Sequence, residues 1–186
     1  MRTFIGIAPD PAARQALAAC VRALAPLLGR ELRWIGPANL HITLAFLGEV
    51  QPPQRQALSH LLQTLALDHG GFELRLDRLI YIPGRRRPRV LAWRIDPHPA
   101  LLALQQDLYK ALAAQGMAVP DRRFMPHLSI ARVRAGRATC LPLPARPPMT
   151  LAVRAVSLYA SRLAPGGAQY SVLQQVALAP AGPAGE

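Results

Sequence analysis

The chain has 186 residues, 51% of them hydrophobic and 17% charged, which excludes a disordered protein and fits one domain. Its net charge of +12 comes almost wholly from arginine and favours polyanionic partners, nucleic acid first and an anionic membrane second. No apolar run is long enough to span a membrane, and the N-terminal apolar run stops at Pro9, too early for a signal peptide. We therefore predict a cytoplasmic protein.

Strands and helices alternate along the chain. The pairs Asp10-Pro11 and Asp96-Pro97 each indicate a helix start, because an N-cap residue is followed by proline in the first turn. The hydrophobic pattern predicts strands at 3–8, 40–47, 72–82, 89–95, 126–133, 151–160 and 169–178, and helices at 10–29, 53–67 and 96–116. A proline-rich loop is expected at 141–148 and a disordered tail at 179–186. This order favours an α+β fold of mainly antiparallel sheets, with 1–178 as a single domain.

Cysteine and histidine spacing excludes the common metal sites. Cys20 and Cys140 lie far apart and form no CxxC pair, so neither a thiolate metal site nor a disulfide framework can be built from them. The five histidines show no HExxH or similar ligand spacing. We therefore expect a protein that works without a metal ion or another cofactor.

A seven-residue pattern occurs twice in the sequence. Residues 39–45 read Asn-Leu-His-Ile-Thr-Leu-Ala, and residues 125–131 read Met-Pro-His-Leu-Ser-Ile-Ala. Because strand side chains alternate between two faces, the histidine and the hydroxyl residue of each pattern share one face. The repeat indicates two related lobes that face each other across a cleft, with the histidines turned toward it.

The repeated histidines, His41 and His127, are candidate catalysts. A single histidine beside a threonine is more often a hydrogen-bonded structural residue, but the same pattern on two strands favours catalysis. His60, His69 and His98 have no matching hydroxyl, and we expect them to be solvated. Near neutral pH one imidazole can accept a proton while another donates one, which is what opening a cyclic phosphodiester requires.

Hydroxyl and guanidinium groups near the histidines fit a phosphate. Thr43 and Ser129 can donate hydrogen bonds to non-bridging phosphate oxygens, where charge must be held during the displacement. Arg132 could add a bidentate cationic contact. Strict alternation places Arg132 on the apolar face with Leu128, so this contact requires the strand to end or twist there.

The chain resembles the bacterial RNA 2′,3′-cyclic phosphodiesterase family, formerly called 2′-5′ RNA ligases, of the two-histidine phosphoesterase superfamily. The matching residues are 2–8, Trp34, 39–48, 89–93 and 124–132, and in order and spacing they cover nearly the whole chain apart from the tail. The extended first motif, which runs through Phe46 to Gly48, is the specific part. The second motif departs slightly, with serine and isoleucine where threonine and leucine are commoner.

The resemblance implies a bilobal two-histidine phosphoesterase (LigT-like) fold, with two pseudo-symmetric lobes, outer helices and a central cleft. It implies metal-independent hydrolysis of a terminal 2′,3′-cyclic phosphate of RNA to a 2′-phosphate. His41 would protonate the leaving 3′-oxygen and His127 would activate water, although the sequence leaves the order of these roles open. It also implies that Phe46 stacks on the terminal base, whereas alternation favours core packing of Phe46 beside Leu44.

Other functions remain open at this point. A 2′-5′ RNA ligase or 2′-5′ phosphodiesterase could use the same residues, and a non-catalytic basic RNA-binding protein would use only the arginines. The arginine run at 85–87, with Arg89, falls at a predicted hairpin tip, where RNA contact and plain solvation are equally compatible with the pattern. The expected partner is RNA with a 2′,3′-cyclic phosphate end, and we expect a monomer.

Overall fold

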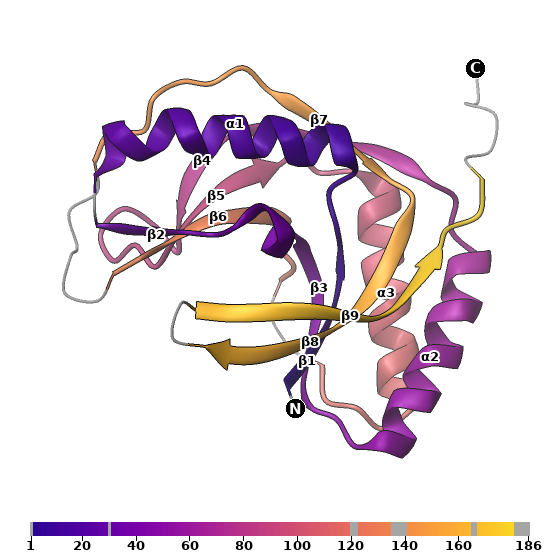
Figure 1. The fold of residues 1–186 in the computed structure, drawn as a ribbon. Helices are drawn as coiled ribbons and strands as arrows, with labels where there is room; N and C mark the ends of the chain where they lie inside the picture. Colours follow the sequence, from indigo (N-terminus) through magenta and orange to yellow (C-terminus); the bar gives the residue numbers. More distant parts are fainter. Residues whose placement is uncertain (1, 30, 120–122, 135–140, 165–166, 181–186) are drawn as a thin grey trace, which may run out of the picture.

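Figure 1 shows the fold in a computed structural model, which describes residues 2–29, 31–119, 123–134, 141–164 and 167–180. The strands of this part are β1 (Arg2–Ile7), β2 (Leu32–Trp34), β3 (Ile42–Glu49), β4 (Phe72–Ile82), β5 (Val90–Ile95), β6 (His127–Val133), β7 (Met149–Val153), β8 (Ala155–Ala164) and β9 (Gly167–Ala177). The helices are α1 (Pro11–Leu28), α2 (Pro52–Leu67) and α3 (Pro99–Ala114), with a short 3-10 helix, η1 (Pro37–Asn39). The predicted order is confirmed, but β2 and η1 were not expected from the sequence.

The strands form one antiparallel sheet in the order β7-β4-β5-β6-β3-β1-β8-β9, with β2 paired to β6. We call β2, β4, β5, β6 and β7 the first lobe, and β1, β3, β8 and β9 the second lobe. The lobes meet where β3 pairs with β6, through the single register pair Ile42 and Leu128. Each of these residues directly follows one of the repeated histidines. The α+β bilobal prediction is confirmed.

Helices cover the outer face of the sheet (Figure 1). Helix α1 packs on β7 and β2 of the first lobe, while α2 packs on β8, β9 and α3, and α3 also contacts β3. Leucines at helical spacing in α1 and α3 are buried in the core: Leu17, Leu24, Leu28, Leu101, Leu104, Leu108 and Leu112. This packing leaves the inner face of the curled sheet for the polar residues of the repeated motifs.

The first predicted helix start is confirmed. Asp10 caps α1, since its Oδ1 accepts hydrogen bonds from the backbone N–H groups of Ala12 and Ala13, both at 3.0 Å. Its Oδ2 accepts a third from the N–H of Ala152 on β7, at 2.9 Å. These bonds lower the pKa of Asp10 against the opposing effect of its burial, which is the largest single influence. Asp10 therefore ties the start of α1 to the edge of the first lobe.

The second predicted helix start is wrong by two residues. Helix α3 begins at Pro99 with His98 in the N-cap position, and no side chain caps it. Asp96 instead accepts a hydrogen bond from Arg94 at 3.2 Å, while a second acid, Asp77, accepts one from the same arginine at 2.6 Å. The carboxylate of Asp96 thus pairs with a guanidinium, where both partners are charged, instead of with the neutral N–H groups of α3.

The strand predicted at 151–160 is also wrong, because the structure divides it. Strand β7 ends at Val153 and β8 begins at Ala155, so that only Arg154 lies between them. Strand β7 pairs with β4 at one end of the strand order, whereas β8 pairs with β1 near the other end. A single connecting residue is sufficient because the sheet curls back on itself (Figure 1).

The expected tail begins at Ala179. Its N–H donates to the carbonyls of Ala66 and His69, and its carbonyl accepts from the N–H of Gly71 at 2.9 Å. Residues 181–186 lie outside the described part of the chain, so their expected disorder stays a prediction. The loop expected at 141–148 has no regular structure. None of the described helices has the length and apolar character needed to cross a membrane.

Candidate active site

The two repeated histidines lie where the lobes meet. His127 is the first residue of β6, and His41 directly precedes β3. Strands β3 and β6 are antiparallel neighbours in one sheet, so the two motifs lie beside each other on adjacent strands and no gap separates them.

Both imidazole rings are held in the same way. Nδ1 of His41 lies 2.7 Å from the carbonyl oxygen of Asn39, and Nδ1 of His127 lies 2.8 Å from that of Met125. A carbonyl can only accept, so each Nδ1 carries the hydrogen and donates it. Nε2 of each ring is therefore the nitrogen left for proton transfer with a ligand.

Aromatic side chains surround His41. The ring of Phe4 lies 4.6 Å from it, Tyr170 meets it edge-on at 5.0 Å, and Tyr159 lies at 6.0 Å. Burial lowers the pKa of His41 below its ordinary value, and the positive charges of His127 and Arg132 lower it further. The hydrogen bond to Asn39 opposes this effect without reversing it.

The predicted hydroxyls, Thr43 and Ser129, lie on the same face as the histidines. Both are partly exposed, while the residues on either side of each are buried, as strand alternation predicts. Within the described part of the chain neither hydroxyl has a hydrogen-bond partner. Both are therefore available to a ligand.

Phe46 and Arg132 lie on this face too, so strict alternation was wrong for both. Leu44 has no register partner on β1, and Ile130 has none on β5, because each strand carries a one-residue bulge there. The extra residue reverses the alternation beyond it. Phe46 is 58% exposed instead of packing in the core with Leu44, and Arg132 points out of the core.

The bulge in β3 depends on a glycine in β1. A Cβ atom on Gly6 would lie 2.6 Å from the carbonyl oxygen of Ile42, far inside van der Waals contact. The two backbones can approach this closely only because Gly6 has no side chain. This close approach occurs next to His41, so the glycine also helps to set where that residue lies.

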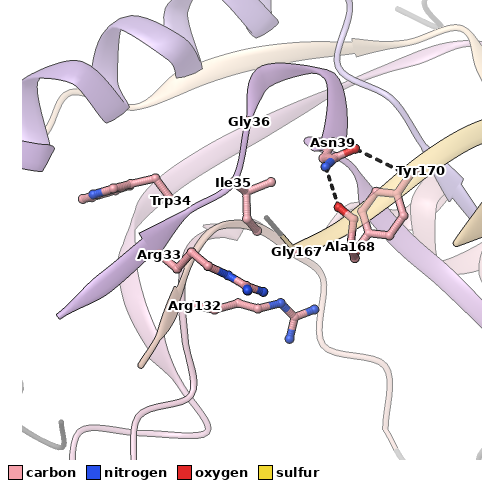
Figure 2. Close-up of a pocket in the computed structure, with 9 residues that line it drawn as sticks. All are labelled: Arg33, Trp34, Ile35, Gly36, Asn39, Arg132, Gly167, Ala168 and Tyr170. Carbon is pink, nitrogen blue, oxygen red and sulfur yellow. Dashed lines mark hydrogen bonds between the residues drawn. The ribbon is translucent and has the colours of Figure 1, made fainter. Parts of the chain in front are cut away.

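A pocket of about 380 Å³ opens between the lobes. Arg33 and Arg132 of the first lobe line it, opposite aromatic and polar side chains of the second lobe: Phe4, Phe46, Ser161 and Tyr170. A smaller adjoining pocket, shown in Figure 2, is lined by the same two arginines together with Asn39 and Tyr170. The pocket thus combines charged groups with stacking surfaces, and the aromatic side chains come from the second lobe.

Asn39 joins β9 of the second lobe to the first of the two repeated motifs. Its Nδ2 donates to the carbonyl of Ala168 at 2.9 Å, and its Oδ1 accepts from the N–H of Tyr170 at 3.3 Å (Figure 2). Neither the two hydrogen bonds of the Asn39 side chain nor the position of Arg33 at the pocket was predicted from the sequence. Strand β2 is only three residues long, and Tyr170 reaches His41 only through long-range pairing, so neither leaves a local signal.

The remaining histidines lie outside the repeated motifs. His60 is exposed, as expected, but the prediction that His69 is solvated is wrong, because its side chain is 11% exposed and lies 3.3 Å from Asp107. His98 is partly buried and stacks on Phe72 at 5.1 Å. Among the described residues, no three His, Cys, Asp or Glu side chains gather where they could hold a metal ion.

Known proteins resemble this chain in sequence and in structure. A family model described as the 2′-5′ RNA ligase superfamily matches residues 8–164. An Escherichia coli (strain K12) protein named RNA 2′,3′-cyclic phosphodiesterase is 35% identical over 153 residues, 78% of this chain and 80% of that protein. A Geobacillus stearothermophilus protein of the same name is 34% identical over 109 residues, 59% of this chain but only 35% of that protein. The crystal structure of E. coli LigT complexed with 3′-AMP has a TM-score of 0.76 at 30% identity, covering 95% of this chain and 97% of that one.

Proposed function

Because this chain belongs to the 2′-5′ RNA ligase superfamily, we propose that it hydrolyses a terminal 2′,3′-cyclic phosphate of RNA to a 2′-phosphate. The names of its relatives support this activity. The observation that carries the proposal is the doubled arrangement of the site. Two imidazoles, each fixed through Nδ1, adjoin two hydroxyls without partners where the lobes meet.

In the proposed reaction a water oxygen bonds to phosphorus while its proton passes to Nε2 of His127. The bond from phosphorus to O3′ breaks on the opposite side, and O3′ takes a proton from Nε2 of protonated His41. Thr43 and Ser129 would donate hydrogen bonds to the non-bridging oxygens, and Arg132 would add positive charge. The two histidines end the reaction with exchanged protonation states, and proton exchange with water resets them.

The lowered pKa of His41 has a consequence for this assignment. In the empty site the residue is mainly neutral near pH 7, whereas an acid must carry its proton. A bound phosphate places a negative charge beside the ring and favours the imidazolium. His41 therefore takes up its proton as the substrate binds. This requires a substrate that carries negative charge.

We propose that Phe46 stacks on the terminal base. Its ring is exposed at the pocket and lies 6.2 Å from Phe4, so a base has an apolar surface to contact. That a relative was crystallised with 3′-AMP supports a nucleoside phosphate in this position. Both lobes of the pocket belong to one chain, which supports a monomer, and an RNA substrate supports a cytoplasmic enzyme.

The test is product analysis of a short RNA that ends in a 2′,3′-cyclic phosphate, incubated with a chelator. We expect wild type to form a 2′-phosphate end, and His41→Ala and His127→Ala each to lose at least about 100-fold in rate. His60→Ala, which removes an exposed histidine outside the repeated motifs, is the matched control and should retain full activity. A wild-type enzyme that leaves this RNA unchanged contradicts the proposed function.

A further inference from the structure

Two arginines at the pocket have like charges and lie side by side. Arg33 of β2 and Arg132 of β6 are direct register partners, and such partners lie about 4.5–5.5 Å apart at Cα. Direct pairing also puts both side chains on the same face of the sheet. In Figure 2 the two guanidinium groups extend in the same direction, toward Gly167 and Ala168.

No carboxylate in the described part of the chain neutralises this pair. Among the described residues, neither Arg33 nor Arg132 makes an ion pair, although other arginines of the same lobe do, such as Arg94 with Asp77. Like charges placed directly opposite on neighbouring strands destabilise a sheet, so the arrangement is costly in the empty protein. An anion between or beside the guanidinium groups would remove that cost.

The two arginines have different positions relative to the proposed reaction centre, so we assign only one of them to the reacting phosphate. Arg132 follows His127 and Ser129 on β6 and lies on the same face, which places it beside the proposed reaction centre. Arg33 lies one strand further out, and its Cζ and Nη2 atoms come within 3.2 Å of where a Cβ of Gly167 would be. The absence of a side chain at Gly167 leaves the space that this guanidinium occupies.

Phe46 and Arg33 line the same pocket. Arg2, Arg33 and Ser161 all line it, in addition to the proposed base-stacking surface. A terminal nucleoside whose phosphate lies at His41 and whose base lies on Phe46 has one further anionic group attached, the phosphodiester at its 5′ side. Arginine is well suited to hold that group through paired N–H donors.

We propose that Arg33, assisted by Arg2, forms a second phosphate subsite that binds the phosphodiester on the 5′ side of the terminal nucleoside. The inference rests on the proposed function and extends it to the substrate class. The enzyme then binds at least two phosphates of its substrate, and it therefore prefers RNA ends to 2′,3′-cyclic mononucleosides. Arg33 is thus a specificity-determining residue that acts on substrate binding and leaves the chemical step unchanged.

The test compares adenosine 2′,3′-cyclic phosphate with a dinucleotide that ends in the same cyclic adenosine. For Arg33→Gln we expect kcat/KM on the dinucleotide to fall by about 10-fold to 100-fold, mainly through KM, the range expected for loss of a charged hydrogen-bonding partner. Activity on the mononucleoside should stay within twofold of wild type, which also shows that the variant is folded. Arg33→Lys should recover only part of the loss, because lysine keeps the charge and loses the paired donors.

The matched control is Arg22→Gln, which removes the same charge from the exposed face of α1. It should leave both substrates unaffected. Equal losses on both substrates would assign Arg33 to the reacting phosphate and overturn the subsite. An unchanged KM for the dinucleotide would also overturn it, and so would an equal loss in Arg22→Gln. If wild type turns over neither substrate, the proposed function itself fails, and an RNA subsite fails with it.

Discussion

His41 packs among Phe4, Tyr159 and Tyr170, whereas none of the ring contacts within the described residues involves His127. The two histidines therefore share a motif and a backbone hydrogen bond but not an environment. Because aromatic rings remove water from one imidazole, its charged form is disfavoured. This difference in surroundings distinguishes His41 from His127 in a site whose two motifs are otherwise nearly alike.

An NMR titration of the imidazole Cε1–H signals should give His41 a pKa below its ordinary value of about 6.5. Arg132→Gln should raise this pKa, because it removes a positive charge, but should not restore it fully, because burial is the largest cause. His60→Ala should leave it unchanged. A pKa of His41 above 6.5 in the unliganded enzyme would contradict this account of the site.

The same shift predicts how stability depends on pH. The unfolded chain binds a proton at His41 near pH 6.5, while the folded chain binds it only at lower pH, so unfolding takes up a proton between these values. The contribution of His41 to stability is thus full above pH 6.5 and is lost as pH falls through the folded pKa. His41→Gln should show a smaller drop in melting temperature between pH 7.5 and pH 5 than wild type. An equal or larger drop in the melting temperature of His41→Gln would contradict the proposed role of His41 in this pH dependence.

At the scale of strands and helices, local signals were enough for the outer layer and for part of the site. The Asp10-Pro11 cap and the spacing of the leucines predicted α1, and alternation predicted that His41 and Thr43 share a face. Alternation failed at Phe46 and Arg132 because each follows a bulge. A bulge depends on the neighbouring strand, so no pattern within the bulged strand reveals it.

Gly6→Ala tests the connection between the β3 bulge and the site. The added methyl group would meet the carbonyl of Ile42 at 2.6 Å and push β1 away from β3 beside His41. We expect a loss of about 1–3 kcal/mol in the free energy of unfolding, the usual effect of overpacking, measured by denaturant titration. The activity of the folded fraction should fall as well.

Gly84→Ala is the matched control for this change, because Gly84 has ordinary φ and a methyl group added there would meet no atom within 4 Å. It should change neither stability nor activity. If Gly6→Ala were as stable and active as wild type, β1 and β3 could separate freely there, and the bulge would not depend on the glycine.

At the scale of the whole molecule, the sequence predicted strands but not all of their partners. The repeated histidine motif was enough to predict two lobes. The separation of β7 from β8 was not predicted, because residues 151–160 are mostly apolar and the lone Arg154 between the two halves did not mark a strand end. The two halves pair with distant strands. Pairing of this kind is decided by contacts far apart in the sequence.

The net charge of +12 predicts a salt dependence that follows the length of the substrate. Each phosphate that the protein contacts on a single strand contributes about −0.7 to the slope of log affinity against log salt. The KM of an RNA end should therefore rise more steeply with salt than that of a cyclic mononucleoside, and Arg33→Gln should reduce the slope for RNA by about 0.7. Identical slopes for the two substrates would show that only one phosphate is bound.

The single residue between β7 and β8 bears on how far the two lobes can move. They are joined at several places: through the strand pairing of Ile42 with Leu128, through the covalent link at Arg154, and through the short segment 35–41 between β2 and β3. A body held at one point can swing, whereas one held at several separate points cannot. The separation of the two imidazoles is consequently set when the chain folds. Little conformational entropy then remains to be lost when a substrate arrives, which is the advantage of a preorganised site.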